Sequence, residues 1–308
     1  MLARWQNVQA FESQDTERRF TFTWGGEGRH EEGESLDRVF KGERGVIAGF
    51  AHAETQLGPW EGIASVRVDH YDDFGARPVF HLGGAFRIAP TVKLRASGGT
   101  GFRVPSFNER LFPFFGNPQL RPEEGASGDA GLDWTLSAGT RLSLTGFYSR
   151  FDDLIQLSFE PRMGPLIGNI PHTRLAGAEL EWETDWGDGL TSGIGYTYTY
   201  TDAEDRDSGK ELPYHPRHTG RAWSQWRLSP LPLTLWAEAD YRGAGWHDRA
   251  NTLRLEDAVR LNLLASYQVL ESMAVYLRVE NLTDNRTPEL FSLASSGTAV
   301  YGGVRIGL

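Results

Sequence analysis

The stretch Leu190-Thr-Ser-Gly-Ile-Gly-Tyr-Thr-Tyr-Thr-Tyr200 shows the strand pattern of this chain at its clearest. Apart from Ser192, apolar or aromatic side chains occupy every second position, and threonine or glycine lies between them. A period of two is characteristic of a β-strand, because successive side chains point to opposite sides of the sheet. The tight turn Trp186-Gly-Asp-Gly189 comes before this strand, and a long hydrophilic segment, residues 202–216, follows it. The rest of the chain repeats this order of a short turn, a strand and a longer polar segment.

Fifteen segments have strand-like patterns of this kind, with boundaries uncertain by about 2–4 residues. They lie near residues 2–11, 18–28, 45–56, 61–71, 78–88, 91–102, 125–136, 141–159, 173–185, 190–201, 217–229, 233–243, 258–269, 274–283 and 298–308.

Short and long connections alternate between these segments. The short connections are rich in Gly, Pro and Ser, as tight turns require, and the long ones are polar or rich in aromatic residues. The short connections are residues 56–60, 88–91, 136–141, 185–190, 229–233 and 269–274. The long connections include residues 29–44, 103–124, 160–172, 202–216, 243–257 and 284–297. Short turns at one end of the strands and long loops at the other are typical of an outer-membrane β-barrel.

The two faces of each strand differ in polarity. In the segment 258–269, Val259 and Leu261 share one face, whereas Arg260 and Asn262 share the other. This alternation alone does not say which face is inside, and a soluble all-β protein such as a propeller is the alternative. The long loops, together with Tyr and Trp near strand ends, favour an apolar face in lipid and a charged face in a wet lumen.

Composition excludes several other classes. The 308 residues carry a formal net charge of −10 and contain no cysteine. A nucleic-acid-binding protein would need a basic surface, so we expect no nucleic-acid partner. Disulfides and thiolate metal sites are impossible, and no apolar run approaches the ~20 residues of a spanning helix. The first residues, Met1-Leu-Ala-Arg-Trp-Gln6, lack the pattern of a secretory signal.

Several motifs resemble a known family. Gly98-Gly-Thr-Gly-Phe-Arg-Val-Pro-Ser-Phe-Asn-Glu-Arg-Leu111 and Gly116-Asn-Pro-Gln-Leu-Arg-Pro-Glu-Glu124 resemble the most recognisable stretch of TonB-dependent outer-membrane receptors. Three more elements follow in the family's order: Phe147-Tyr-Ser-Arg-Phe-Asp-Asp-Leu-Ile155, then Gly168-Asn-Ile170 with Gly177-Ala-Glu-Leu-Glu181, and Val279-Glu-Asn-Leu-Thr-Asp284. The resemblance covers about residues 18–308 and is closest to the cobalamin and siderophore receptors.

The resemblance implies an all-β fold, an antiparallel transmembrane β-barrel of the outer-membrane receptor type. Plugged transporters of this class have 22 strands, so about 15 of the 22 are present. Nothing in residues 1–308 matches the family's plug domain. We therefore expect residues 1–308 to be the C-terminal portion of the barrel domain, with the plug and the first strands upstream. Leu308 also departs from the family, whose barrels end on an aromatic residue.

The resemblance also implies a function. The receptor would sit in the outer membrane of a Gram-negative bacterium and take up a bulky, scarce solute such as a ferric siderophore or cobalamin. Its partners would be outer-membrane lipid, a metal-chelate or cobalamin-type ligand, and the TonB complex, which acts through the plug. Neither catalysis nor a cofactor is implied.

Two other functions remain as alternatives. A passive outer-membrane channel would need an even strand count and a signal peptide. An outer-membrane hydrolase would need a nucleophile and a base, and His215 and His218 are the kind of residue it would use. No G-x-S-x-G or H-E-x-x-H motif accompanies them, and no His/Asp/Glu cluster has the spacing of metal ligands.

The candidate ligand-binding residues lie in three of the long connections. With the C-terminus on the periplasmic side, hairpin counting places these connections outside the cell. Exposed aromatic rings beside a few polar groups suit a bulky ligand, although the same residues could instead pack loop against loop. The candidates are Arg103, Phe112, Phe114 and Phe115 in the first connection, Tyr214 and His215 in the second, and Trp246 and His247 in the third.

Overall fold

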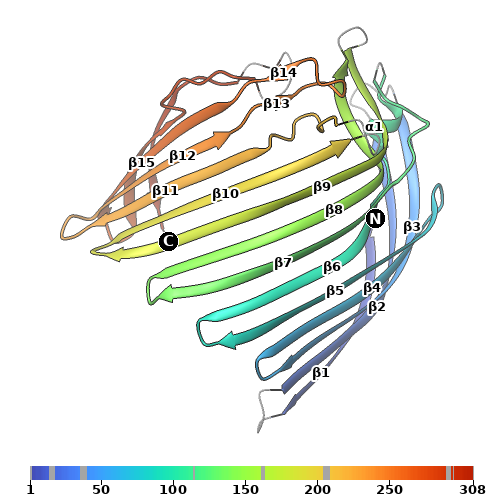
Figure 1. The fold of residues 1–308 in the computed structure, drawn as a ribbon, viewed down its shortest axis with the longest axis horizontal. Coiled ribbons are helices and arrows are strands. Elements are labelled where there is room, and N and C mark those ends of the chain that lie inside the picture. Colours follow the sequence, from blue (N-terminus) through green and yellow to red (C-terminus); the bar gives the residue numbers. More distant parts are fainter. Residues whose placement is uncertain are drawn as a thin grey trace. The chain divides into compact units, whose positions relative to one another are not determined.

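The computed structural model describes residues 2–13, 18–34, 40–113, 115–160, 164–203, 209–288, 293 and 295–307. Across these residues the fold is almost entirely β-structure, with one five-residue helix, α1. Fifteen strands form one sheet in chain order, except that β15 follows β12, and the short strands β13 and β14 form a second sheet (Figure 1). Each of the fifteen predicted segments coincides with one strand of the large sheet. The predicted all-β fold and its strand number are confirmed.

The bounds of the elements extend beyond several of the predicted segments. They are β1 Leu2–Ser13, β2 Arg18–Glu34, β3 Lys41–Leu57, β4 Trp60–Tyr71, β5 Gly75–Ala89, β6 Val92–Arg103, α1 Phe107–Leu111, β7 Glu123–Ser137, β8 Thr140–Glu160, β9 Gly164–Gly187, β10 Leu190–Ala203, β11 His218–Leu228, β12 Leu233–Arg242, β13 Gly245–Trp246, β14 Arg254–Leu255, β15 Ala258–Leu270, β16 Met273–Glu280 and β17 Ala299–Ile306.

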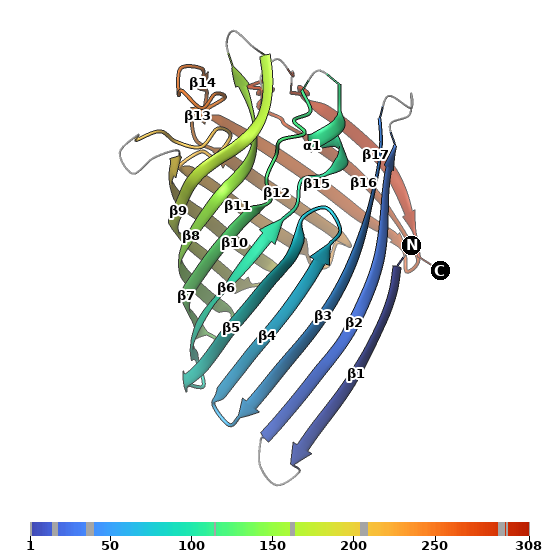
Figure 2. The same ribbon diagram turned by 90° about the vertical axis from the view of Figure 1, so that its right-hand side faces the viewer.

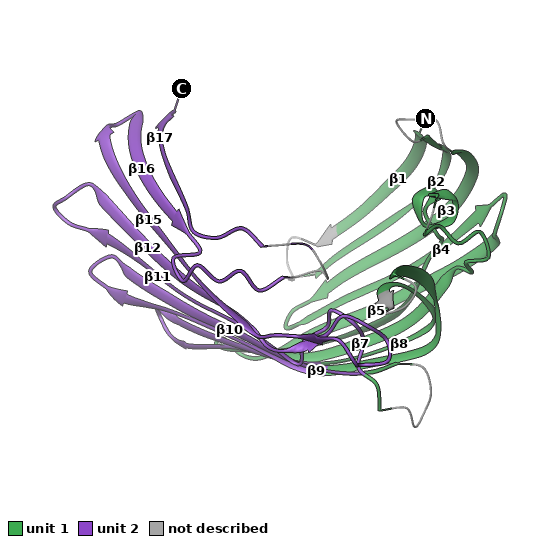
Figure 3. Cartoon of the chain, turned by 90° about the horizontal axis from the view of Figure 1, so that it is seen from above, with its two compact units in different colours: residues 1–132, 147–176, 202–210 green, residues 133–146, 177–201, 211–308 purple. Residues whose placement is uncertain are grey.

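The chain divides into two compact units, which are described separately (Figure 3). Unit 1 comprises residues 1–132, 147–176 and 202–210, and unit 2 comprises residues 133–146, 177–201 and 211–308. Strands β1 to β6 and helix α1 belong to unit 1, where β1 to β6 run as successive antiparallel neighbours (Figure 2). Strands β11 to β17 belong to unit 2.

The strand register of unit 2 gathers apolar side chains on one face and charges on the other. Asp240 lies opposite Arg260, and Arg278 lies opposite Tyr301, on the charged face. A shift of one residue in any strand would exchange its two faces, so the observed register preserves the separation. Cross-strand pairs of the apolar face include Ala239–Leu261, Tyr241–Val259, Leu263–Val279, Leu277–Gly302 and Val275–Val304.

The apolar face of unit 2 is exposed. Leu277 is 54% exposed, Val300 64% and Ile306 68%. Exposed apolar surface that continues over several strands is unfavourable in water and marks a face that meets another apolar phase. The expected direction of the alternation, with large apolar side chains outward, is consistent with this exposure.

Two predicted long connections are wrong, because strands replace most of them. Residues 29–44 were expected to form a loop, but β2 continues to Glu34 and β3 begins at Lys41. Residues 160–172 were also expected to be a loop, but β9 begins at Gly164. In β2 the reason is that His30-Glu31-Glu32 leaves neither face apolar, so alternation does not reveal the strand. In β9 the buried Ile167 and Ile170 are three residues apart rather than two, and the Gly and Pro residues around them are typical of a loop. Residues 35–39 and 161–163 lie outside the described residues.

The alternation of connection lengths is also less strict than predicted. The connection between β4 and β5 contains only residues 72–74, although it lies at the same ends of the strands as the longer loops. The predicted short connections are confirmed as tight turns, including residues 58–59 between β3 and β4. Gly58 has a φ of 57°, which glycine adopts without steric cost.

Two of the predicted long connections contain small elements that alternation did not indicate. Residues 103–124 include α1, and residues 243–257 include β13 and β14. Among the described residues no helix has the length and apolarity required to cross a membrane.

Candidate functional site

The first group of candidate residues belongs to unit 1 and surrounds α1. Pro105 lacks a backbone N–H, so the ladder of β6 cannot continue through it. Ser106 then begins the helix with a capping box. Its hydroxyl accepts from the Glu109 amide at 3.2 Å, and its own amide donates to the Glu109 carboxylate at 2.7 Å. These local bonds form a helical turn within an otherwise irregular connection.

Arg103 connects this turn to the sheet. Its guanidinium lies 2.8 Å from the Glu109 carboxylate and 2.9 Å from that of Glu123, and it donates to the Ile155 carbonyl at 3.4 Å. Burial alone would raise the pKa of Glu109. The bonds donated by the Ser106 amide and Arg103 outweigh burial, so the pKa of Glu109 lies below its usual value. The guanidinium therefore pairs with carboxylates of unit 1, and its contact with a ligand stays a prediction.

Three phenylalanine rings form what we call the aromatic tip: Phe40, Phe112 and Phe115. The rings of Phe112 and Phe115 are stacked with centroids 4.6 Å apart, and Phe40 meets Phe112 edge to face at 6.2 Å. Phe112 is 38% exposed. Phe114, a predicted ligand residue, lies outside the described residues. The tip thus offers a partly exposed aromatic surface, as predicted for Phe112 and Phe115, while Phe40 was missed.

The second group of candidate residues belongs to unit 2, on two loops that we call the paired loops, residues 211–217 and 243–257. The Tyr214 amide donates to the Trp246 carbonyl at 2.8 Å, and the Tyr214 ring meets the His247 ring at 5.5 Å. His215 contacts the Pro213 carbonyl through Nδ1 at 2.8 Å. The structure therefore brings together candidates from the second and third predicted loops.

His247 differs from the expectation of an exposed loop residue, since it is only 6% exposed. Burial lowers its pKa, and the nearby Arg242 lowers it further, against an opposing effect of Asp248. The imidazole is therefore neutral at pH 7. Its ring contributes to packing between the paired loops, which is the alternative that the sequence left open.

Asp248 fixes a turn within one of the paired loops, Asn251 joins that loop to the other, and sequence reasoning missed both. Asp248 is fully buried and accepts from the Thr252 amide and hydroxyl and from the Leu253 amide. Asn251 accepts from the Glu211 amide at 2.8 Å and donates to its carbonyl at 3.0 Å. An Asp followed four residues later by Thr is a local signal for such a turn. The bond to residue 211 is not local and has no such signal.

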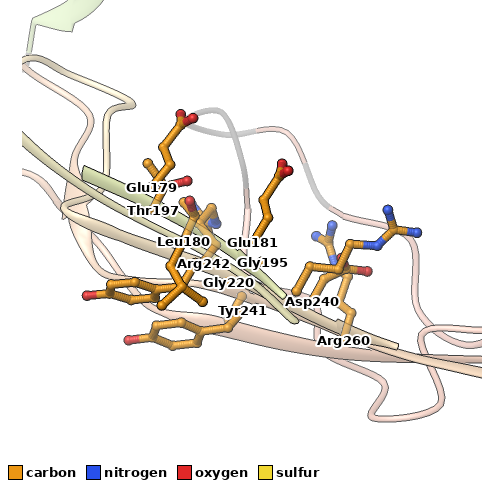
Figure 4. A pocket seen from close by; sticks show the side chains of 14 residues that line it. Glu179, Leu180, Glu181, Gly195, Thr197, Gly220, Asp240, Tyr241, Arg242 and Arg260 are labelled. Atoms are coloured by element: carbon orange, nitrogen blue, oxygen red, sulfur yellow. The ribbon is translucent and has the colours of Figure 1, made fainter. Parts of the chain in front are cut away.

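A hollow of about 400 Å³ lies on the charged face of unit 2. Its lining includes Glu179, Glu181, Asp240 and Arg260, which point to one side of the strands, while Tyr241 points to the other (Figure 4). Acidic and basic groups are mixed, so the hollow favours no single sign of charge. No group of three or more His, Asp or Glu residues in the described part of the chain is placed to hold a metal ion.

Comparisons with known proteins identify what this arrangement is similar to. The family model "TonB dependent receptor-like, beta-barrel" matches residues 4–282. The vitamin B12 transporter BtuB of Photobacterium profundum is 30% identical over 251 residues, which are 79% of this chain and 40% of that protein. The iron-regulated outer membrane virulence protein of Vibrio cholerae is 26% identical over 58% of this chain and 30% of that protein.

Solved structures share the fold. The ferric enterobactin receptor PfeA of Pseudomonas aeruginosa, crystallised with enterobactin, superposes with a TM-score of 0.76 at 16% identity and covers 99% of this chain. The copper transporter OprC superposes with a TM-score of 0.75 at 14% identity and covers 97%. This chain covers 54% and 55% of those two chains. It therefore spans about half or less of the relatives that it matches.

Proposed function

The chain belongs to the TonB-dependent receptor β-barrel family, and from that membership we propose that it forms the wall of an outer-membrane transporter. Among the relatives reported above, BtuB is named as a transporter and PfeA as a receptor. Receptors of this family lie in the outer membrane of Gram-negative bacteria. We extend that location to this protein.

The observation that carries the proposal is the separation of charge between the two faces of the sheet. In unit 2 large apolar side chains of β10, β11, β12 and β15 to β17 are exposed, and Arg221, Glu238 and Asp240 lie on the opposite face. Arg221 forms an ion pair with Glu238. A lipid-facing wall requires large apolar residues outside and tolerates charge only toward a wet lumen. A soluble barrel would reverse this arrangement.

Residues 1–308 make up the C-terminal portion of the barrel domain in this proposal, with a plug and earlier strands upstream. The support is that the chain covers only 40% of the matching vitamin B12 transporter and 54% of the matching enterobactin receptor. TonB would act on the whole receptor through that plug. The lipid of the outer membrane is the partner of the apolar face.

The transported solute is a bulky, scarce compound such as a ferric siderophore or a cobalamin. The aromatic tip of unit 1 and the residues Tyr214, His215 and Trp246 of unit 2 are the proposed contacts, because partly exposed rings beside polar groups can pack against a large ligand. Arg103 binds Glu109 of α1, and His247 packs against the Tyr214 ring, so both residues support these surfaces.

The test is uptake by cells that carry the full-length receptor gene, compared with cells in which the gene is deleted. Labelled cyanocobalamin and a ferric siderophore are supplied at nanomolar concentration, with and without TonB. We expect uptake of one compound that requires both the receptor and TonB. Uptake that persists without TonB would instead indicate a passive channel.

A further inference from the structure

Arg44 of β3 is almost completely buried, with 2% of its surface exposed, although the sequence predicted a loop at this position. A buried guanidinium is costly unless hydrogen bonds and opposite charge compensate it. The contacts of Arg44 therefore show which segments of the chain it joins. All of them lie in unit 1.

The polar partners of Arg44 come from three different segments. Its Nη2 donates to the carbonyl of Pro105 at 2.9 Å, directly before α1. Its Nε donates to Asp73 at 3.1 Å, in the turn between β4 and β5, and its Nη1 lies 3.6 Å from Glu31 of β2. One side chain thus connects two strand ends with the start of the helical segment.

Aromatic rings surround the same guanidinium. The centre of the guanidinium lies 5.7 Å from the Tyr71 ring, 5.3 Å from the Phe74 ring and 5.0 Å from the Phe107 ring. Cations over aromatic faces are stabilised most when water is excluded. Phe107 is the first residue of α1, so this contact again links Arg44 to the helix.

The helix is held from two further sides. Arg110 of α1 lies 3.1 Å from the same Asp73 carboxylate that Arg44 binds. Gly33 and Gly42 lie directly opposite each other on β2 and β3, and a Cβ atom on either would overlap the Phe107 ring. The absence of side chains at these two positions makes the space that the ring occupies. Helix α1 lies against β3 accordingly.

From these contacts we infer that Arg44 is a positioning residue, which holds α1 and the aromatic tip in one arrangement before ligand arrives. The inference rests on the proposed function, because the tip is a proposed ligand surface. Phe112 follows α1 directly, and its amide donates to the Asn108 carbonyl at 3.1 Å. A surface that is ordered in advance loses less conformational entropy on binding, which raises affinity.

The experiment uses the full-length receptor in detergent or vesicles. Residues 1–308 contain no cysteine, so once any cysteine elsewhere in the receptor is replaced, an Asn108→Cys variant carries one spin label on an exposed position of α1. The label is then compared in receptors with Arg44, Arg44→Ala or Arg44→Lys. Arg67→Ala is the matched control. Arg67 also pairs with an aspartate at 2.7 Å and lies near a phenylalanine ring, but these partners, Asp69 and Phe50, belong to strands and not to α1.

We expect Arg44→Ala to mobilise the label and to raise about tenfold the Kd for cyanocobalamin or the ferric siderophore, whichever the receptor with Arg44 binds, with an unchanged yield of folded receptor. Arg44→Lys keeps the charge but loses the planar guanidinium. Its label mobility and Kd should therefore lie between those of the receptors with Arg44 and with Arg44→Ala. Gly42→Val should reproduce the mobility and the loss of affinity with Arg44 intact. Arg67→Ala should change neither.

An immobile label with an unchanged Kd in Arg44→Ala would overturn the inference. So would a lower yield of receptor whose folded fraction binds normally, because Arg44 would then serve only folding. If Arg44→Ala does not fold, Arg44→Lys and Gly42→Val still decide the question. The label reports without ligand. If Arg44→Ala mobilises the label but the receptor with Arg44 intact binds neither cyanocobalamin nor the ferric siderophore, the proposed function fails and the positioning role stands.

Discussion

At the scale of single residues, the buried carboxylate of Asp248 holds one of the paired loops, residues 243–257, in a single conformation. Asp248 accepts hydrogen bonds from three donor groups of Thr252 and Leu253 and is fully buried. An ionised carboxylate without such donors would be strongly destabilising inside a protein. The carboxylate therefore fixes the turn between β13 and β14.

Replacing Asp248 with Ala should open the paired loops, because the amides of Thr252 and Leu253 would lose their acceptor. We expect a loss of local stability of about 2–3 kcal/mol. Trypsin cleavage after Arg249 and Arg254 measures it, with Asp248→Asn as the conservative variant. Equal cleavage rates in all three receptors would contradict the role of Asp248.

His247 should make the paired loops sensitive to acid. Its pKa is lowered by burial and by Arg242, so the open loops bind a proton more readily than the closed ones. The stabilisation is complete above the usual histidine pKa of about 6.5 and decreases as the pH falls below it. Hydrogen exchange of residues 211–217 and 245–255, corrected for intrinsic rates, should accelerate between pH 7 and pH 5. The acceleration should be absent in His247→Asn, and an equal acceleration in that variant would contradict this assignment.

At the scale of elements, alternation predicts strands well where one face is apolar and fails where both faces are polar. The segment 258–269 was located to within a residue of β15, because its apolar and charged faces are distinct. The extension of β2 through His30-Glu31-Glu32 was missed, since it has no apolar face. Phe40 was missed for another reason. Its contact with Phe112 joins residues far apart in the chain.

The face assignment of β16 gives a direct test. Leu277 is 54% exposed on the apolar face, and Arg278 lies on the charged one. Leu277→Lys should lower the free energy of unfolding in vesicles by about 2–4 kcal/mol if residue 277 lies near the bilayer midplane. Arg278→Lys should be tolerated. Folding titrations that rank the two variants in the opposite order would show that the faces are reversed.

At the scale of the whole molecule, the candidate residues form two separate groups, one in unit 1 and one in unit 2. The sequence predicted the loops that carry both groups, because exposed aromatic residues concentrate in them. It did not predict that His247 is buried or that Arg103 pairs with Glu109 and Glu123. Those outcomes depend on contacts between segments distant in the chain, which local patterns do not contain.

The measurement that tests the account most directly is a cysteine scan of β16 in the full-length receptor. Residues 1–308 contain no cysteine, so once any cysteine elsewhere in the receptor is replaced, each of residues 275–279 can carry one fluorescent label in vesicles that contain brominated lipid. We predict that lipid quenches the labels at residues 275, 277 and 279, and that a water-soluble quencher reaches those at 276 and 278. Equal quenching by lipid at all five positions, or quenching at none, would contradict a membrane-spanning barrel wall.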